Sequence, residues 1–262
     1  MKQAKQTIAK SFLILFLFPL ILFSCNDASD EPAPDAALSH SVDPSLLIFS
    51  KTNGFRHESI ETGQQALSTL AQDEGLSVTV TEEADYFLSE NFPEYDAVLF
   101  LNTDGNIFED SHREALRTFV EDGGGFIGIH GASATEREWA WFRELIGARF
   151  ANHPNDPNVF EAAIRVVDTG HPATEMLPER WVRDDEWYNF DEIPENVHVL
   201  LEMDTDSYEG SEHPGDHPIA WVHENVGGRV FYTALGHTPE SYWDEYFMGH
   251  IRGGIRYVLG NE

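Results

Sequence analysis

His130 follows a short apolar segment and is flanked by small residues, a pattern that exposes a side chain at the end of a strand. Residues 123–132 read GGGFIGIHGA, and the apolar run ends at His130 between small residues. In α/β proteins a buried strand followed by a tight turn of small residues holds a reactive side chain at the strand end. An imidazole in that place can act as a metal ligand or as a general acid or base. The alternative is a buried histidine that only hydrogen-bonds the backbone.

Three further histidines follow strand-like segments or lie in loops, and they could join His130. His57 lies in the loop after the first predicted strand, His153 lies in FANHP, and His237 ends the segment YTALGH. Their alternatives are a helix-capping role, a solvated loop position and a plain turn, respectively. The number of candidate ligands slightly favours a metal, and nitrogen and oxygen ligands suit Zn, Mn, Fe or Ni.

The segment DDEWYNF combines carboxylates with aromatic rings. Asp185 and Glu186 could supply oxygen ligands or move a proton, and Trp187 and Tyr188 follow them directly. Rings that cover C–H faces beside carboxylates that accept hydroxyl hydrogen bonds are typical of sugar sites. A solvated acidic face is the alternative.

These patterns give the following predicted site. The predicted catalytic residues are His130, Asp185, Glu186 and His237; the predicted substrate-binding residues are Arg56, Trp187 and Tyr188; the predicted metal ligands are His57, His130, His153 and His237.

The elements that must position these residues indicate an α/β domain. Strands are predicted at 46–50, 76–80, 96–102 and 125–129, with helices near 60–72 and from Ser111, the expected N-cap with Glu114 three residues on. Near-continuous apolar strands that alternate with helices predict a mostly parallel sheet with helices on both faces. The carboxyl ends of such strands share one edge. The loop after Ser50 and the turn at His130 are therefore expected to lie together.

The second half of the chain is more irregular. Strands are predicted at 158–167, 197–203, 218–224 and 228–235, with a final helix over about Ser241–Leu259. Two hairpin-like pairs are expected to extend or flank the parallel core. No repeat and no second domain are visible.

Seven motifs together resemble the ThuA-like (trehalose-utilisation) family. They are GFRHESI, GGGFIGIHGA, FANHPNDP, HPATEMLPERW, DDEWYNF, HPIAWV and GRVFYTALGHTPESYW, in this order. The resemblance covers nearly all of residues 45–260. It implies a class I glutamine-amidotransferase-like, flavodoxin-like three-layer fold with extra β-hairpins in the second half. It also implies a carbohydrate substrate, such as a disaccharide or its oxidised keto-glycoside derivative.

The resemblance also bears on the chemistry. In amidotransferases of the wider fold, the position of His130 carries a cysteine nucleophile, and a later HPE-like segment carries a histidine and a glutamate. Here GHTPE places His237 and Glu240 where those later partners would lie. Imidazole is a poor replacement for a thiolate nucleophile, so we expect no glutaminase activity.

Two functional hypotheses follow. In the first, a metal polarises a sugar carbonyl or hydroxyl and Asp185 or Glu186 moves the proton in a hydrolysis or isomerisation. In the second, the protein binds a carbohydrate without reacting with it. A metal-free hydrolase that uses only Glu and His side chains is disfavoured, because the sequence lacks an obvious pair of carboxylates in separate motifs. No nucleotide cofactor is expected.

The N-terminus indicates export. Three lysines precede an apolar run over 12–23 that is shorter than a membrane-spanning helix, and LFSC then ends at Cys25, the only cysteine. LFSC resembles a bacterial lipobox, which implies lipidation of Cys25. We predict a signal peptide over 1–25, a flexible tether over 26–44, the domain over 45–262, and anchoring to the periplasmic face or the cell surface. An uncleaved N-terminal anchor is the alternative.

The charge of the chain restricts its partners. All 46 acidic residues follow Cys25 and three of the 16 basic residues precede it, which leaves 46 acidic against 13 basic residues and a net charge of −33. Nucleic acid is therefore not an expected partner, and membrane contact is expected through the N-terminal lipid alone. Only Lys51 among those basic residues is a lysine, a composition that suggests adaptation to high salt. The alternative is an acidic exported protein without such adaptation. The sequence leaves the oligomeric state open.

Overall fold

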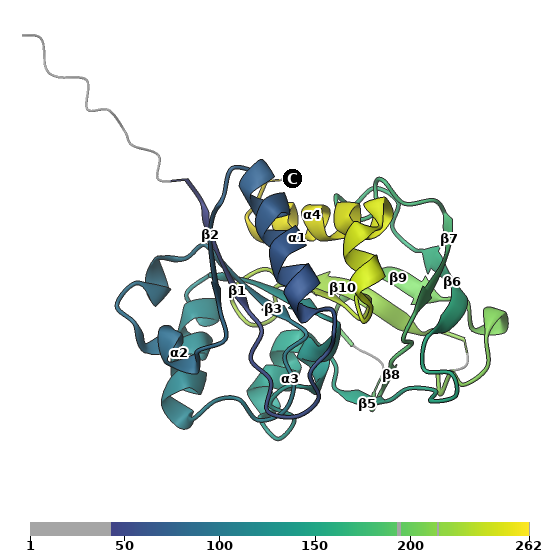
Figure 1. Ribbon diagram of the computed structural model, residues 1–262, viewed down its shortest axis with the longest axis horizontal. Helices are drawn as coiled ribbons and strands as arrows, with labels where there is room; N and C mark the ends of the chain where they lie inside the picture. The colour runs from purple at the N-terminus through teal and green to yellow at the C-terminus, as the bar shows by residue number, and fades with distance from the viewer. Residues whose placement is uncertain (1–42, 193–194, 214, 262) are drawn as a thin grey trace, which may run out of the picture. The chain divides into compact units, whose positions relative to one another are not determined.

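The computed structural model describes residues 43–192, 195–213 and 215–261, and a nine-stranded sheet runs through them with the order β2-β1-β3-β4-β11-β10-β9-β6-β7 (Figure 1). The first five strands of this order pair in parallel and the others pair antiparallel. The strands are β1 (Ser45–Phe49), β2 (Ser77–Thr81), β3 (Ala97–Leu101), β4 (Gly125–Ile129), β6 (Phe160–Val166), β7 (Arg180–Asp185), β9 (His198–Met203), β10 (Pro218–His223) and β11 (Val230–Thr233). The predicted signal peptide with Cys25 and the tether up to residue 42 lie outside the described residues.

Burial explains the central strands. The sequences LLIF in β1, AVLFL in β3 and GFIGI in β4 are apolar throughout, and every one of these residues is buried. A strand that is covered on both faces has no solvent side and therefore no polar alternation. The four strands predicted in the first half are confirmed.

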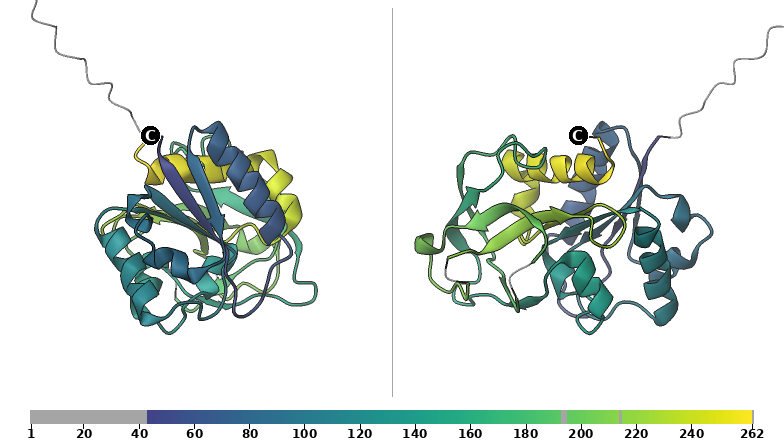
Figure 2. Two further views of the ribbon diagram at one scale, coloured as in Figure 1. Left: turned by 60° about the vertical axis from the view of Figure 1, so that its left-hand side comes forward. Right: turned by 180° about the vertical axis from the view of Figure 1, so that it is seen from behind.

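Helices cover both faces of the sheet, as predicted. Helices α1 (Ile60–Asp73) and α4 (Glu245–Val258) lie on one face, and α2 (Asp110–Glu121) and α3 (Ala140–Ile146) lie on the other (Figure 2). Antiparallel pairs in the second half extend the parallel part, so the expected α/β class and its added hairpins are confirmed. Among the described residues, no helix is both long enough and apolar enough to cross a membrane.

Two helix starts differ from the prediction. Helix α2 begins at Asp110, and its capping box joins Glu109 to His112 rather than Ser111 to Glu114. The final helix does not begin at Ser241, because residues 239–243 form the 3-10 helix η5; α4 starts after Asp244, whose carboxylate accepts two helical N–H groups. A carboxylate caps a helix as well as a hydroxyl does, so either residue type can mark the start.

Three strands were not predicted. Strands β5 (Phe150–Asn152) and β8 (Asn189–Phe190) are very short and form a separate pair. Strand β7 reads RWVRDD, and its residues alternate between exposed and buried at the end of the large sheet. Its many charges hid the alternation in the sequence.

The antiparallel strands return the chain to the edge where the parallel strands end. Three antiparallel reversals separate β10 from β7, and a fourth separates β11 from β10, so β7 runs in the same direction as β11. The residues after β1, β4, β7 and β11 therefore leave the sheet on one side. This side carries the candidate site.

Candidate metal centre

His130 stands in a strained turn at the end of β4. It opens the 3-10 helix η3 (His130–Ala134) with φ +47°, a backbone conformation that costs a non-glycine residue about 1–2 kcal/mol. Gly131 follows, and a Cβ there would lie 3.0 Å from the carbonyl oxygen of Thr103. The backbone therefore forms the presenting turn that the sequence predicts.

Hydrogen bonding fixes the tautomer of His130. Its Nδ1 lies 2.6 Å from the carbonyl oxygen of Ala234 and must donate to it, because a carbonyl only accepts. In a neutral ring, Nε2 then carries a lone pair. Ligand histidines of metal sites are oriented in this way by a carbonyl behind the ring.

His237 follows β11 on a tight loop. Gly236 has φ +107°, and the carboxylate of Asp185 accepts the backbone N–H groups of Gly236 at 3.0 Å and His237 at 3.1 Å. Asp185 is fully buried and also lies 3.2 Å from Arg183. Asp185 thus holds the His237 loop and does not line the cavity described below.

His57 lies in the loop between β1 and α1 and is 3% exposed. Its Nδ1 is buried and has no hydrogen-bond partner among the described residues. Burial, together with the neighbouring His130 and His237, lowers the pKa of His57 to about 2. The ring is therefore neutral, the form that binds metals.

Glu186 follows β7 and is 4% exposed. Its Oε2 lies 3.3 Å from Nε2 of His130 and 3.1 Å from Nδ1 of His237. Burial raises the pKa of Glu186, but the hydrogen bonds and charges of these two histidines outweigh burial and hold the pKa below its usual value. The carboxylate is therefore anionic.

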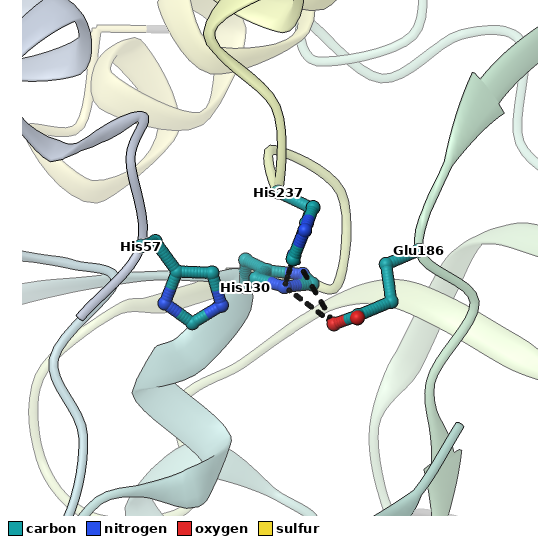
Figure 3. Close-up of side chains that lie close together, drawn as sticks. All are labelled: His57, His130, Glu186 and His237. Atoms are coloured by element: carbon teal, nitrogen blue, oxygen red, sulfur yellow. Dashed lines mark hydrogen bonds and ion pairs between the residues drawn. The ribbon is translucent and has the colours of Figure 1, made fainter. Parts of the chain in front are cut away.

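The four side chains converge on one point (Figure 3). The ring centroids of His57, His130 and His237 lie 4.9, 5.0 and 5.1 Å apart, and the four ligand atoms, including that of Glu186, lie within 4.8 Å of one another. Bonds of about 2.0–2.2 Å to a tetrahedral zinc would place ligand atoms about 3.3–3.6 Å apart. A divalent cation among these four atoms would accept a lone pair from each of them. We call these four residues the His3Glu group.

The His3Glu group opens into a cavity of about 360 Å³. Ligand pockets have volumes of about 300–1,000 Å³, so this cavity is at the small end of that range. Both His57 and Glu186 line it. The other lining residues are Phe55, Asp104, Ala134, Phe150, His153, Asn155, Asn158 and Tyr188.

Two further predicted residues lie beside the group. Nδ1 of His153 donates to the carbonyl of Pro154, and its Nε2 lies 3.3 Å from Oε1 of Glu186. His153 therefore contacts one of the four converging residues but is not itself a member of the His3Glu group. The ring of Tyr188 packs 4.1 Å from that of His130, centroid to centroid. Burial raises the pKa of Tyr188 well above its usual value, which keeps the hydroxyl protonated.

The other two predicted substrate-binding residues lie away from the cavity lining. Trp187 is 1% exposed and donates its indole N–H to the carbonyl of Phe160. Arg56 forms ion pairs with Glu61 at 2.7 Å and Glu82 at 2.9 Å. Their side chains are already occupied by packing and by carboxylates.

Asn102 is a positioning residue that the sequence analysis missed. It is fully buried with φ +48° at the end of β3, and its side-chain N–H groups lie 3.0 Å from the hydroxyl of Ser59 and 3.2 Å from the carbonyl of Gly236. Its Oδ1 accepts the N–H of Gly131 at 3.2 Å. Asn102 thus ties together the loops of His57, His130 and His237. The available signal was its place directly after a buried strand.

Comparisons with known proteins concern the family and the fold of the chain. The family model ThuA, described as trehalose utilisation, matches residues 45–258. A protein described as ThuA-like from Bacteroides uniformis is 25% identical with a TM-score of 0.70, over 87% of this chain and 95% of that one. A second, from Parabacteroides merdae, is 18% identical with a TM-score of 0.63, over 83% and 91%.

A more distant similarity concerns the fold alone. A glutamine amidotransferase from Thermotoga maritima is 12% identical with a TM-score of 0.52, over 83% of this chain and 98% of that one. The comparison with curated proteins found no match.

Proposed function

The chain belongs to the ThuA family, described as trehalose utilisation, and from this membership we propose that it is a metal-dependent protein acting on a carbohydrate. The substrate class proposed is a disaccharide or its oxidised keto-glycoside, and the reaction class is hydrolysis or isomerisation. Family membership supports the carbohydrate role, and the His3Glu group supports the metal.

The observation that carries the proposal is the convergence of four potential ligand atoms, one each from His57, His130, Glu186 and His237, within 4.8 Å of one another. Three imidazoles and one carboxylate suit Zn, Mn, Fe or Ni. A metal held there would polarise a sugar carbonyl or hydroxyl.

The chain's own residues then have distinct proposed roles. His57, His130 and His237 bind the metal together with Glu186, and Tyr188 lies against the ring of His130 at the cavity wall. Of the two carboxylates considered for proton transfer, only Glu186 lines the cavity, whereas Asp185 binds backbone N–H groups. Asp185 is therefore proposed as a positioning residue.

We also propose that the protein is exported and lipid-anchored. The lipobox-like LFSC supports lipidation of Cys25, and the net charge of −30 argues against nucleic acid as a partner. Mass spectrometry of the protein from a bacterial host that processes lipoproteins would detect an acylated Cys25.

The functional test uses purified protein with zinc, or with zinc removed by EDTA. Binding of trehalose and of its oxidised keto derivative is measured by calorimetry, and conversion is followed by NMR. The metal-loaded protein should bind and convert at least one of them, and EDTA should abolish conversion. His130→Ala and His237→Ala should lose conversion, whereas His198→Ala, a 58% exposed histidine paired with Asp168, should not.

The outcomes separate the hypotheses. Binding that survives EDTA without any conversion would identify a carbohydrate-binding protein in place of an enzyme. A lack of binding to both sugars, with or without zinc, would contradict the carbohydrate role.

A further inference from the structure

Two loops at the cavity are joined through their backbones. The loop after β1 donates the N–H of Asn53 to the carbonyl of Asp104 at 2.8 Å, and the side chain of Asn53 donates to the carbonyl of Asn106 at 2.9 Å. Thr52 and Asp104 also form an isolated parallel bridge. The positions of Asp104 and of the residues after Asn53 are therefore fixed relative to each other.

The carboxylate of Asp104 uses only one of its oxygens. Oδ1 accepts the N–H of Phe55 at 2.8 Å, whereas Oδ2 accepts no hydrogen bond from any residue of the described ranges. A Cβ on Gly54 would lie 1.9 Å from Oδ1, so the glycine leaves the space that the carboxylate occupies. Asp104 lines the cavity with an acceptor atom that lacks a donor.

The environment of this carboxylate is poor in positive charge. No arginine or lysine of the described residues forms an ion pair with Asp104, although Arg137 exerts a weaker attraction from a distance. Burial raises the pKa of Asp104, and the N–H of Phe55 offsets this only in part. A hydroxyl donor from a ligand would stabilise such a carboxylate.

Phe55 places an aromatic ring at the cavity beside the metal ligands. Its side chain is 61% exposed, which is unusual for phenylalanine, and its ring meets that of His57 edge-on with centroids 4.8 Å apart. The hydrogen bond from its backbone N–H to Asp104 holds the backbone of Phe55 beside the cavity. An exposed ring at a cavity offers an apolar face to a ligand.

We propose that Asp104 and Phe55 are the carbohydrate-recognition pair of this site. Oδ2 of Asp104 accepts a hydrogen bond from a sugar hydroxyl, and the ring of Phe55 covers a C–H face of the sugar. No covalent bond changes in this step. The inference rests on the proposed function, because it assigns the recognition of the same carbohydrate to residues outside the His3Glu group.

The first test is Asp104→Asn in the zinc-loaded protein, with trehalose as the probe and calorimetry as the measurement. Asparagine keeps an oxygen for the N–H of Phe55 but replaces the free acceptor with an NH2 group. We expect about 10- to 100-fold weaker trehalose binding, the effect of losing a hydrogen bond to a charged group. Zinc content should stay unchanged. Asp43→Asn, an exposed carboxylate before β1, is the matched control.

The second test distinguishes the effect of the aromatic ring of Phe55 from that of an apolar side chain in general. Phe55→Leu should weaken trehalose binding by about 3- to 10-fold, and Phe55→Tyr, which keeps the ring, should restore it. Thermal unfolding followed by circular dichroism checks that each variant is folded.

Each other outcome overturns the inference in a recognisable way. If the wild type binds trehalose and both Asp104→Asn and Phe55→Leu bind it equally well, the pair has no role and the proposed function stands. If Asp104→Asn loses zinc, the residue acts through the metal. If the zinc-loaded wild type does not bind trehalose, the carbohydrate function fails for this probe and the inference fails with it.

Discussion

At the scale of single residues, the turn at His130 presents an imidazole at the end of the buried strand β4. The strained φ and the adjacent glycine make a presenting turn, and the Ala234 carbonyl leaves Nε2 as the atom that faces Glu186 and His237. The backbone conformation of the turn and the carbonyl behind the ring thus suit a metal ligand.

The neighbouring carboxylates of Glu186 and Asp185 have different proposed roles, and a pair of matched variants tests them. We predict that Glu186→Gln weakens zinc binding by more than about 100-fold, because it removes the only charged ligand of the group. Asp185→Asn should weaken it by about 10- to 100-fold, the usual effect of a residue that orients a ligand. Competition with a chromophoric chelator measures both affinities.

Asp184→Asn is the control for both variants, since Asp184 is exposed on β7. An unchanged affinity in Glu186→Gln would remove Glu186 from the ligands. A larger loss in Asp185→Asn than in Glu186→Gln would reverse the assigned roles.

The sequence predicted three of the four converging residues as metal ligands, but it did not predict the fourth as one. His57, His130 and His237 were predicted as ligands because they follow strands whose carboxyl ends share an edge, and the three rings do converge. The fourth member of the converging group is Glu186 instead of His153. That choice depends on how β7 returns to the site, which local spacing does not encode.

At the scale of elements, the sheet must curl to complete the site. Strand β7 is four positions from β11 in the sheet, about 19 Å along a flat sheet. Yet Asp185 at the end of β7 binds the backbone of Gly236 and His237 just after β11. Sheet twist and the irregular pairing of β9 with β10 allow this approach.

Asn102 provides the test at this scale. Asn102→Ala removes the hydrogen bonds that the Asn102 side chain makes to the N–H of Gly131 and the carbonyl of Gly236. It also places alanine at a positive φ, where its side chain cannot form the local hydrogen bonds that stabilise asparagine in this conformation. We predict a loss of about 2–4 kcal/mol in the free energy of unfolding, measured with urea.

Asn102→Gly separates the two causes. Glycine also lacks the side chain but tolerates positive φ, so it should be about 1 kcal/mol more stable than the alanine variant. A stability equal to that of the wild type in both variants would show that Asn102 does not hold the loops.

Elements were predictable where the physical signal is local. Strands β1, β3 and β4 are continuous apolar runs, and that pattern survives without tertiary information. Strand β7 at the sheet end and the short β5 and β8 owe their pairing to distant segments. Helix starts were ambiguous because Glu109 and Asp244 compete with nearby serines as caps.

At the scale of the whole molecule, charge should govern stability. The chain carries a net charge of −30 at pH 7, and self-repulsion of this size opposes the compact state at low ionic strength. Raising salt from 0.1 to 1 M shortens the screening length from about 10 to 3 Å. We predict that KCl over this range raises Tm by at least about 2 °C, which corresponds to about 1 kcal/mol for a domain of this size.

The salt experiment is a thermal scan in KCl with an equal osmolality of sucrose as the control. A larger rise in Tm with KCl than with sucrose indicates that salt screens the repulsion between the acidic side chains. A Tm that does not change with KCl would contradict the proposed adaptation of this acidic chain to high salt.

The most direct measurement of the central claim is an anomalous-scattering map at the zinc edge from crystals of the zinc-loaded protein. The account predicts one peak at about 2.0–2.2 Å from nitrogens of His57, His130 and His237 and from a carboxylate oxygen of Glu186. Bound zinc at another position, with no peak among these four side chains, would contradict it.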